Sequence, residues 1–462
     1  MNKEAISLLI HGGRIIDPGR RIDQLGDLLI AEGRIMQVGG TVILSRSLER
    51  GEGKVKNLDA TGLVVCPGFI DLHCHLREPG FEDKETIATG TKAAAIGGFT
   101  TVCCMANTKP PLDNAAAVDW IRQKTSKDSL VAVLPIGCIT KARKGEELTD
   151  MAELAEAGVV AFSDDGNPVA SSQLMRRAME CSRELGLPII DHCEDKGLSH
   201  DGIINEGEMS AKLGVKGIPA AAEEVAVARD LILAKLTRAR LHIAHVSTKG
   251  SVELIRRAKE DGVSVTAEVT PHHLTLTEER VVREPPNKSF DTNAKVNPPL
   301  RTKEDVQALI KGLRDGVIDV IATDHAPHTL ADKNCGPEQA AFGISGLETA
   351  FGCLMTLVHQ REMSLTQLIS KLTCESAKVI GRNGELGTLK KGIPANITIL
   401  DPDREWIVNS RNFASKGKNT PYDGYQLKGK VMATIANGKI VYIDDSLKVD
   451  NYLKIGTTRE KT

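Results

Sequence analysis

The residues most able to do chemistry stand at the end of an apolar run, Pro67 to Leu72. His73 and His75 close this run, and Arg77 follows two residues later. Side chains two apart in a strand point the same way, so the two imidazoles project together. Neutral imidazole nitrogens side by side can hold one divalent metal ion. The planar guanidinium of Arg77, where strand gives way to loop, suits a substrate carboxylate. The alternative to a metal site is that these are simply two surface histidines at a strand end. A metal site therefore requires further ligands elsewhere in the chain.

Length and composition place the chain among ordinary globular proteins. It has 462 residues, 26% of them charged, with a net charge of -2. That length suffices for one large domain and a smaller one. The charge pattern indicates neither a nucleic acid nor a membrane surface as partner. Ten cysteines without a CxxC pair predict buried thiols. The chain starts with polar residues, has no long apolar run and predicts no secretory signal, so we expect a cytoplasmic protein.

The two ends of the chain resemble each other. Residues 8–16 and 434–442 both predict a strand, a tight glycine turn and a second strand. Residues 27–38 predict another hairpin, and residues 395–400 a further strand. We therefore predict one small β-sandwich domain built from both termini, covering roughly 1–66 and 387–455.

Between these ends, short apolar runs alternate with helical segments. Apolar strands that alternate with helices indicate a parallel sheet covered on both faces, and eight such units predict a (β/α)₈ barrel of the TIM type over 67–386. An open doubly wound sheet is the alternative, but no Gly-x-Gly-x-x-Gly follows any run. The eight runs are 69–75, 100–105, 130–136, 159–163, 188–192, 241–245, 263–269 and 317–323, and helices are expected at 171–185, 220–236, 251–260 and 303–313.

Polar residues follow most of the predicted strands. In a barrel, chemistry takes place at the carboxyl ends of the strands, which meet at one mouth. A single histidine there is more often structural, and Asp-Asp-Gly is also the composition of a turn. The recurrence after six of eight runs argues for one shared site. The residues concerned are His73, His75, Arg77, Asn107, Asp164, Asp165, Asp191, His192, Glu194, His245, Asp324, His325 and His328.

A few neighbouring residues are expected to support this site. Asp71 and Asp191 stand one or two residues before a histidine and could orient imidazoles from behind the site. We expect Cys193 to be a small, packed side chain, and a role as a metal ligand stays open for it. His242 should face away from His245, and His272 and His273 should lie behind the site.

Several motifs together carry a resemblance to a known family. Residues 73–80 read HCHLREPG, which is similar to the signature of the dihydroorotase family in the amidohydrolase superfamily. Residues 105–108 are similar to the Met-Pro-Asn-Thr of that family, with Ala106 at the proline position. Five more motifs match in order, so the resemblance covers nearly the whole chain. They are residues 163–166, 191–195, 243–247, 296–301 and 322–328.

The resemblance implies one or two zinc ions and a defined set of contacts. His73, His75 and Asp324 would hold one zinc, His192 and His245 would hold a second, and Asp165 would bridge the two. Many superfamily members bridge with a carboxylated lysine, whereas Asp165 resembles the class I type with an aspartate bridge. Occupancy of the second zinc position stays open. The implied substrate contacts are Arg77, Asn107, Asn297, His328 and the backbone around Phe342 and Gly343.

The resemblance also implies a reaction. It is the zinc-dependent, reversible cyclisation of N-carbamoyl-L-aspartate to (S)-dihydroorotate in pyrimidine biosynthesis, with Asp324 as the proton carrier. One alternative is another cyclic amidohydrolase, of the allantoinase or dihydropyrimidinase type, but these usually have the lysine bridge and lack an arginine after HxH. A non-catalytic scaffold is another, and it should lack ligands, whereas none is missing here. A homo-oligomer and association with aspartate transcarbamoylase both stay open.

Overall fold

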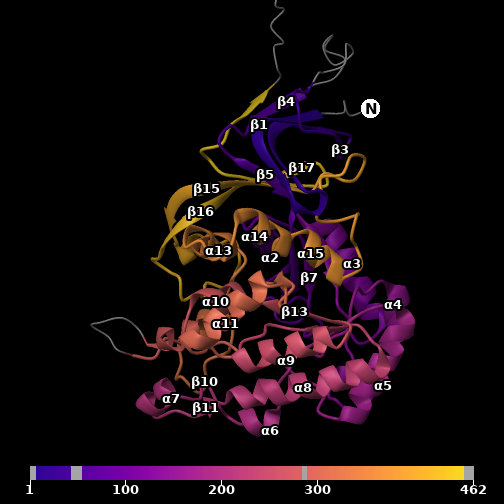
Figure 1. Ribbon diagram of the computed structural model, residues 1–462, viewed down its shortest axis with the longest axis vertical. Helices are drawn as coiled ribbons and strands as arrows, with labels where there is room; N and C mark the ends of the chain where they lie inside the picture. The colour runs from indigo at the N-terminus through magenta and orange to yellow at the C-terminus, as the bar shows by residue number, and fades with distance from the viewer. Residues whose placement is uncertain (1–6, 43–54, 283–288, 452–462) are drawn as a thin grey trace, which may run out of the picture.

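The computed structural model describes residues 7–42, 55–282 and 289–451. Within these ranges, no helix combines the length and apolar character that a membrane crossing requires. The polar start of the chain lies outside the described residues. A β-rich part occupies the top of Figure 1, and a part rich in helices lies below it.

Strands from both ends of the chain join in one nine-stranded sheet. The two ends meet where β5 pairs antiparallel with β15, with Cys66 opposite Thr398. Apolar side chains such as Leu58 and Ile397 are fully buried and form the core of this sheet. Its strands are β1 (Ser7–Asp17), β2 (Ile22–Ala31), β3 (Arg34–Val38), β4 (Val55–Asp59), β5 (Val64–Pro67), β15 (Ile397–Ile407), β16 (Gln426–Ala436), β17 (Lys439–Ile443) and β18 (Val449–Asn451).

Two of the three predicted hairpins are confirmed. Asn437 and Gly438 turn β16 into β17, and Glu32 and Gly33 turn β2 into β3. The hairpin predicted over 8–16 is wrong, because β1 runs straight through it with a one-residue bulge. Gly12, with a φ of 71°, accommodates that bulge. β1 pairs with β2 on one side and with β4 and β5 on the other, so the terminal strands are joined into one connected sheet.

The central strands pair in parallel and follow one another in a closed circuit, which we call the strand ring. β6, β7 and β8 pair in that order, as do β9, β12, β13 and β14. Single parallel bridges through Phe162 join β8 to β9, and Cys74 pairs with His325 to close the circuit. The strands are β6 (Phe69–Cys74), β7 (Phe99–Cys104), β8 (Ala132–Pro135), β9 (Ile189–Asp191), β12 (Leu241–Ile243), β13 (Val265–Val269) and β14 (Val320–Ile321).

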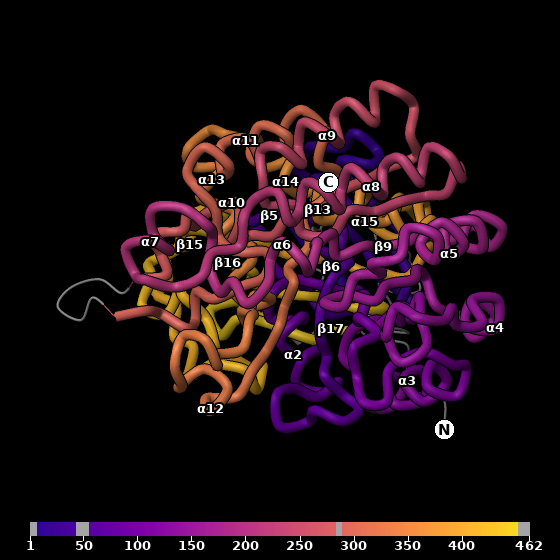
Figure 2. Tube along the Cα trace, turned by 90° about the horizontal axis from the view of Figure 1, so that it is seen from below, coloured from indigo at the N-terminus to yellow at the C-terminus, as the bar shows by residue number. Residues whose placement is uncertain are grey.

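The helices surround the strand ring, as Figure 2 shows. All four predicted helices are present, with ends shifted by at most two residues. Side chains at their starts accept backbone N–H groups, for example Ser171 before α5 and Thr302 before α11. The long helices are α2 (Ile87–Ile96), α3 (Ala115–Asp128), α5 (Ser172–Leu185), α8 (Ala220–Thr237), α9 (Lys249–Glu260), α11 (Lys303–Arg314) and α13 (Ala350–His359).

Shorter elements lie between these helices or near the carboxyl ends of the strands. They are α4 (Met151–Ala157), α6 (Lys196–Ser199), α7 (Glu208–Leu213), α10 (Pro271–Thr275), α12 (Leu330–Lys333), α14 (Leu365–Leu372), α15 (Cys374–Val379), β10 (Ile204–Asn205) and β11 (Gly217–Ile218).

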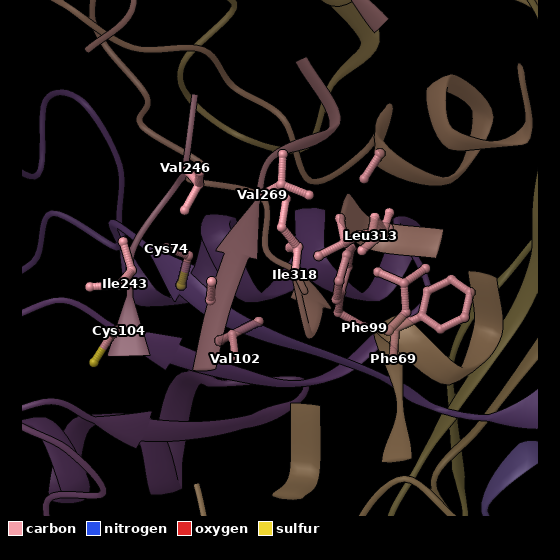
Figure 3. Packing of buried hydrophobic residues seen from close by; sticks show 14 of the residues in the cluster. Phe69, Cys74, Phe99, Val102, Cys104, Ile243, Val246, Val269, Leu313 and Ile318 are labelled. Carbon is pink, nitrogen blue, oxygen red and sulfur yellow. The ribbon is translucent and has the colours of Figure 1, made fainter. Parts of the chain in front are cut away.

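Apolar packing holds the strand ends in place. The rings of Phe69 and Phe99 meet edge to face with centroids 5.7 Å apart (Figure 3). The interior of the strand ring is filled by side chains such as Leu72, Ile136 and Ile190, so it is a packed core and not a pore. Close packing leaves the backbone little freedom to shift, so polar residues at the strand ends have defined positions.

Candidate metal centre and active site

A cavity of about 560 Å³ opens at the carboxyl ends of the strands. It gathers predicted residues that lie more than 200 positions apart in the chain. His73 lies beneath it and is fully buried. The predicted residues that line the cavity are His75, Arg77, Asn107, Asp165, His192, Glu194, His245, Asn297, Asp324, His328, Phe342 and Gly343.

Two histidines of β6 and its loop converge on two carboxylates. His73 Nε2 lies 3.5 Å from Asp165 Oδ1 and 3.5 Å from Asp324 Oδ1. His75 Nε2 lies 3.0 Å from Asp324 Oδ1 and 3.6 Å from Asp165 Oδ2. Two imidazole nitrogens and two carboxylates therefore surround one point, with spacings that a small cation would span.

A second group shares Asp165 with the first. His192 Nδ1 lies 2.9 Å from His245 Nε2, and these nitrogens lie 3.5 and 3.7 Å from Asp165 Oδ1. The ligand atoms of each three-residue group, His73–His75–Asp165 and Asp165–His192–His245, all lie within 4.8 Å of one another. Asp165 is thus placed where one carboxylate could reach two cations.

The donor set fits a divalent transition metal. His73 Nε2 is buried and has no hydrogen-bond partner among the described residues. Its other nitrogen faces a glutamate at 2.7 Å, so Nε2 carries a lone pair directed at Asp165 and Asp324. A buried lone pair facing two carboxylates is unfavourable unless a cation lies between them. Imidazole nitrogen with carboxylate oxygen is a donor set that zinc and its neighbours accept.

The carboxylates of this centre are held in the ionised state. Burial by itself raises the pKa of Asp324, but its contacts with the imidazoles of His73 and His75 hold that pKa well below its usual range. The pKa of Asp165 is also lowered, against burial, by its contacts with the imidazoles of His73, His192 and His245. Both carboxylates are therefore available as anionic ligands at neutral pH.

Glu268 of β13 contacts the candidate centre, and sequence reasoning did not predict it. It is fully buried and accepts hydrogen bonds from His73 Nδ1 at 2.7 Å and from His242 Nε2 at 3.1 Å. Burial raises the pKa of Glu268, and His73 and His242 bring it down to about 2. The carboxylate selects the imidazole tautomer that turns Nε2 of His73 towards the centre. A charged residue inside the apolar run 263–269 is the signal that could have revealed it.

Glu194 orients His192 in the second group, as Glu268 orients His73 in the first. Its Oε2 accepts from His192 Nε2 at 2.9 Å and from Asn297 Nδ2 at 3.0 Å, and Lys196 donates to it at 2.6 Å. His192 therefore presents Nδ1, not Nε2, to Asp165 and His245.

The expectation that Asp71 and Asp191 orient imidazoles is wrong. The carboxylate of Asp71 accepts from the backbone N–H and hydroxyl of Thr323 at 2.8 and 2.6 Å, which ties β6 to the end of β14. Asp71 lies one strand step deeper in the ring than His73, below the centre. Asp191 directly precedes His192, so it points to the other face and contacts Cys193 at 3.4 Å.

Asp164 and Asp165 have separate tasks. The Asp164 carboxylate accepts the backbone N–H of Ile139 at 2.9 Å and the N–H and hydroxyl of Thr140, so it braces the loop after β8. It faces away from the cavity that Asp165 lines. The predicted strand 159–163 shrinks to a single bridged residue, Phe162, because the chain turns into this loop contact.

The predicted substrate contacts form the wall of the cavity. Arg77 donates from Nε to the carbonyl of Pro327 at 3.2 Å, and its Nη2 lies 3.3 Å from His328 Nε2. His328 Nε2 also lies 2.8 Å from the carbonyl oxygen of Phe342. The Arg77 guanidinium thus has a fixed position on the cavity wall.

Asn107 is engaged within the centre as well as lining the cavity. His75 Nδ1 donates to its Oδ1 at 2.9 Å, and its Nδ2 donates to Asp165 Oδ2 at 3.2 Å. The amide therefore fixes the orientation of an imidazole and a carboxylate, a task that the sequence does not predict.

Comparison with known proteins identifies the family. The family model described as "Dihydro-orotase-like" matches residues 62–251. The chain is 51% identical to a dihydroorotase of Thermoanaerobacter sp. (strain X514), over 95% of this chain and 98% of that protein. It is 48% identical to a dihydroorotase of Citrifermentans bemidjiense, over 95% of this chain and 100% of that protein. The solved structure of an L-hydantoinase (dihydropyrimidinase) from Arthrobacter aurescens superposes with a TM-score of 0.83 at 25% identity, covering 96% of this chain and 98% of that one. With these identities over nearly its full length, the chain belongs to the dihydroorotase family of cyclic amide hydrolases.

Proposed function

We propose that the protein catalyses the reversible cyclisation of N-carbamoyl-L-aspartate to (S)-dihydroorotate, a step of pyrimidine biosynthesis. The observation that carries this proposal is the pair of histidine groups sharing Asp165 in a cavity whose wall holds Arg77. Family membership supports the same reaction. We take the strand ring as a (β/α)₈ barrel of the TIM type over 67–386, with the domain of 1–66 and 387–455 beside it.

We further propose zinc as the cofactor, with one or two ions per chain. His73, His75 and Asp324 would hold one ion, His192 and His245 the other, and Asp165 would lie between them. A bound zinc ion supplies a Lewis acid and lowers the pKa of a water molecule towards about 7. The lone pair on His73 Nε2 and the paired nitrogens of His192 and His245 support this assignment.

Asp324 is proposed to carry the proton. Its carboxylate lines the cavity and is ionised at neutral pH, which is the state that a proton acceptor requires. In hydrolysis, water adds to the ring amide carbonyl and the carbon–nitrogen bond breaks. Asp324 takes the proton of the water and returns it to the departing ring nitrogen. In cyclisation the same steps run in reverse: Asp324 takes a proton from the ureido nitrogen as that nitrogen attacks the carboxyl carbon, and it returns the proton to the oxygen that leaves as water.

Arg77 is proposed to bind the substrate carboxylate. The guanidinium is held from one side by the Pro327 carbonyl, which keeps it in a fixed position on the cavity wall. Asn107, Asn297, His328, Phe342 and Gly343 complete this wall and would hold the ring so that one carbonyl faces the centre. Hydantoins and dihydrouracil lack that carboxylate, so Arg77 favours dihydroorotate over them.

A substrate comparison tests the proposal. Purified protein with measured metal content would be assayed with dihydroorotate, hydantoin, dihydrouracil and allantoin under one set of conditions. We expect dihydroorotate to give the highest kcat/KM, and a strong chelator to abolish turnover until zinc is restored. A preference for a neutral ring, or full activity without metal, would overturn the assignment.

A further inference from the structure

Two lysine side chains are buried close to the cavity. Lys295 and Lys333 are 1% and 2% exposed, although lysine is rarely buried without a partner of opposite charge. In the described part of the chain, the hydrogen bonds of both ammonium groups go to backbone carbonyl oxygens and not to carboxylates. Burying a charge is costly unless it is hydrogen-bonded, so these bonds have to offset that cost.

Lys333 joins two separate segments of the chain. Its Nζ atom donates to the carbonyl oxygens of Thr292 at 3.0 Å and Ala341 at 2.6 Å, and a third carbonyl, that of Lys295, lies at 3.4 Å. Three acceptors match the three N–H groups of a protonated amine. Ala341 belongs to residues 334–343, which we call the cavity loop because its last two residues line the cavity.

Lys295 binds the same loop at further points. Its Nζ atom donates to the carbonyl oxygens of Pro337 at 2.8 Å and Glu338 at 3.1 Å. It also lies 4.4 Å from the centre of the Phe342 ring, a cation–π contact. The backbone carbonyl of Lys295 accepts the N–H of Gly343 at 2.9 Å. The two lysine side chains, which we call the ammonium clamp, therefore hold the cavity loop along much of its length.

The end of the cavity loop is also held by residues that follow β14. His328 Nε2 lies 2.8 Å from the carbonyl oxygen of Phe342. A Cβ atom on Gly343 would lie 2.7 Å from the Cβ atom of Ala326, so the backbone passes very close to that residue. The ammonium clamp and these contacts together leave the backbone of the last two loop residues little freedom to shift.

Stability alone does not explain two buried lysines side by side. Burial and the charge of Lys295 lower the pKa of Lys333 to about 7, and burial lowers the pKa of Lys295 to about 8. The folded protein thus disfavours both charges, and apolar side chains of similar volume can often replace buried charges without loss of stability. Apolar side chains cannot bind the carbonyl groups of a loop whose side chains from 334 to 339 are mostly exposed.

We propose that Lys333 and Lys295 are positioning residues for the substrate. This inference rests on the proposed function, in which the backbone around Phe342 and Gly343 contacts the ring. The ammonium clamp acts through the cavity loop and does not itself touch the substrate. It holds that backbone at the place where the ring binds, as a preorganised site requires.

Neutral side chains of similar length test the inference through steady-state kinetics. Lys333→Met should raise the KM for dihydroorotate at least about tenfold and leave kcat within about threefold, because a displaced backbone weakens the binding of substrate and transition state alike. Lys295→Met should act in the same direction, and it keeps the inference testable if the first variant does not fold. Circular dichroism and metal content would show that each variant is folded.

Lys371→Met is the matched control. The Lys371 side chain is also partly buried and donates to a backbone carbonyl, that of Ile318 at 3.0 Å, but this contact lies before β14 and away from the cavity. Its KM should stay normal. An unchanged KM in both clamp variants, an equal rise in the control, or a loss of kcat alone would overturn the proposal.

Hydrogen exchange of the cavity loop gives a measurement that does not depend on the reaction. The N–H groups of Ala341 and Gly343 are hydrogen-bonded, so their exchange rates report opening of the loop. Both should exchange faster in Lys333→Met than in the wild type and the control. If the wild type does not act on dihydroorotate, the proposed function fails, yet faster exchange would still support the ammonium clamp. Unchanged exchange would overturn it.

Discussion

The Nδ1 atom of His73 lies 2.7 Å from Oε1 of Glu268, and both side chains are fully buried. This contact decides which ring nitrogen of His73 faces the cavity. Because Glu268 also binds His242, it cannot turn away without losing a second partner. Its position is therefore as constrained as that of the histidine.

Glu268→Gln should weaken metal binding by about 10–100-fold, the usual effect of losing such a partner. The amide keeps the size but lacks the charge that stabilises the Nδ1–H tautomer of His73. The release of metal to a chelator would measure the change without an activity assay. Glu223→Gln is the control, since Glu223 is also buried but binds Ser247 and Thr248. Equal release rates in the two variants would show that Glu268 has only a packing role.

Asp324→Asn should lower kcat by about 10²–10⁴-fold, the range of general acid–base catalysis. The change keeps the shape and removes the proton acceptor. Metal content has to be measured in the same sample, because Asp324 is also a proposed ligand. Asp319→Asn, which alters a carboxylate paired with Lys259 away from the cavity, should keep normal activity. A rate within tenfold of wild type would mean that another group carries the proton.

Arg77→Lys should lower kcat/KM for dihydroorotate, because lysine keeps the charge but loses the planar fork. Turnover of a neutral ring such as dihydrouracil should change little. Steady-state kinetics with both substrates checks the difference. Equal losses for both would mean that Arg77 acts by holding Pro327 and not by binding the substrate.

Asp165→Ala and Asp164→Ala should differ although the residues are adjacent. The first should lower metal content and rate together, with little loss of stability. The second should keep the metal and lose about 1–3 kcal/mol of stability, because it leaves buried N–H groups of residues 139 and 140 unpaired. Metal analysis and denaturant unfolding separate the two effects. Activity should also not depend on bicarbonate, since an aspartate needs no carboxylation.

Glu348 should make stability fall as the pH rises from about 5 to 8. Burial raises its pKa to about 7, despite hydrogen bonds from the N–H groups of Ala414 and Ser415. The folded state holds the proton more tightly than the unfolded state, so the stabilisation present at low pH is lost through pH 7. Glu348→Gln should show a smaller fall, by up to a few kcal/mol at about 1.4 kcal/mol per pKa unit. Unfolding curves at several pH values measure the slope, and identical slopes would contradict the assignment.

Much of the architecture could be predicted from local sequence patterns. The alternation of apolar runs and helices predicts the order of the parallel strands, and the helices lie where expected. The strands themselves are shorter than the apolar runs, as in β14, which has two residues where seven were predicted. The apolar runs are longer because residues beyond the last hydrogen-bonded strand pair are still buried in the core, as Ala322 is after β14. The glycine pair in β1 indicated a turn, since a bulge and a turn need the same backbone freedom.

The site was predictable where its residues follow strands in sequence. His192 and His245 are found this way because strand ends meet at one mouth. Glu268 and Asn107 could not be assigned their contacts, because these depend on distances between strands that no single run encodes. Asp164 and Asp165 are adjacent residues of the same type, so the sequence does not tell which of them faces the cavity. The path of the loop decides this.

The pairing of Cys74 with His325, which closes the strand ring, has a consequence for the synthesis of the protein. The two partners are about 250 residues apart, so a ribosome making roughly 5–20 residues per second needs about 10–50 s between them. His73 and His75 are made at the start of that interval, whereas Glu268 and Asp324 are made only near its end. A nascent chain that ends at residue 251 holds five of the six proposed ligands and no closed ring. We therefore expect the complete six-ligand centre to form only after Asp324 has been made and the ring has closed.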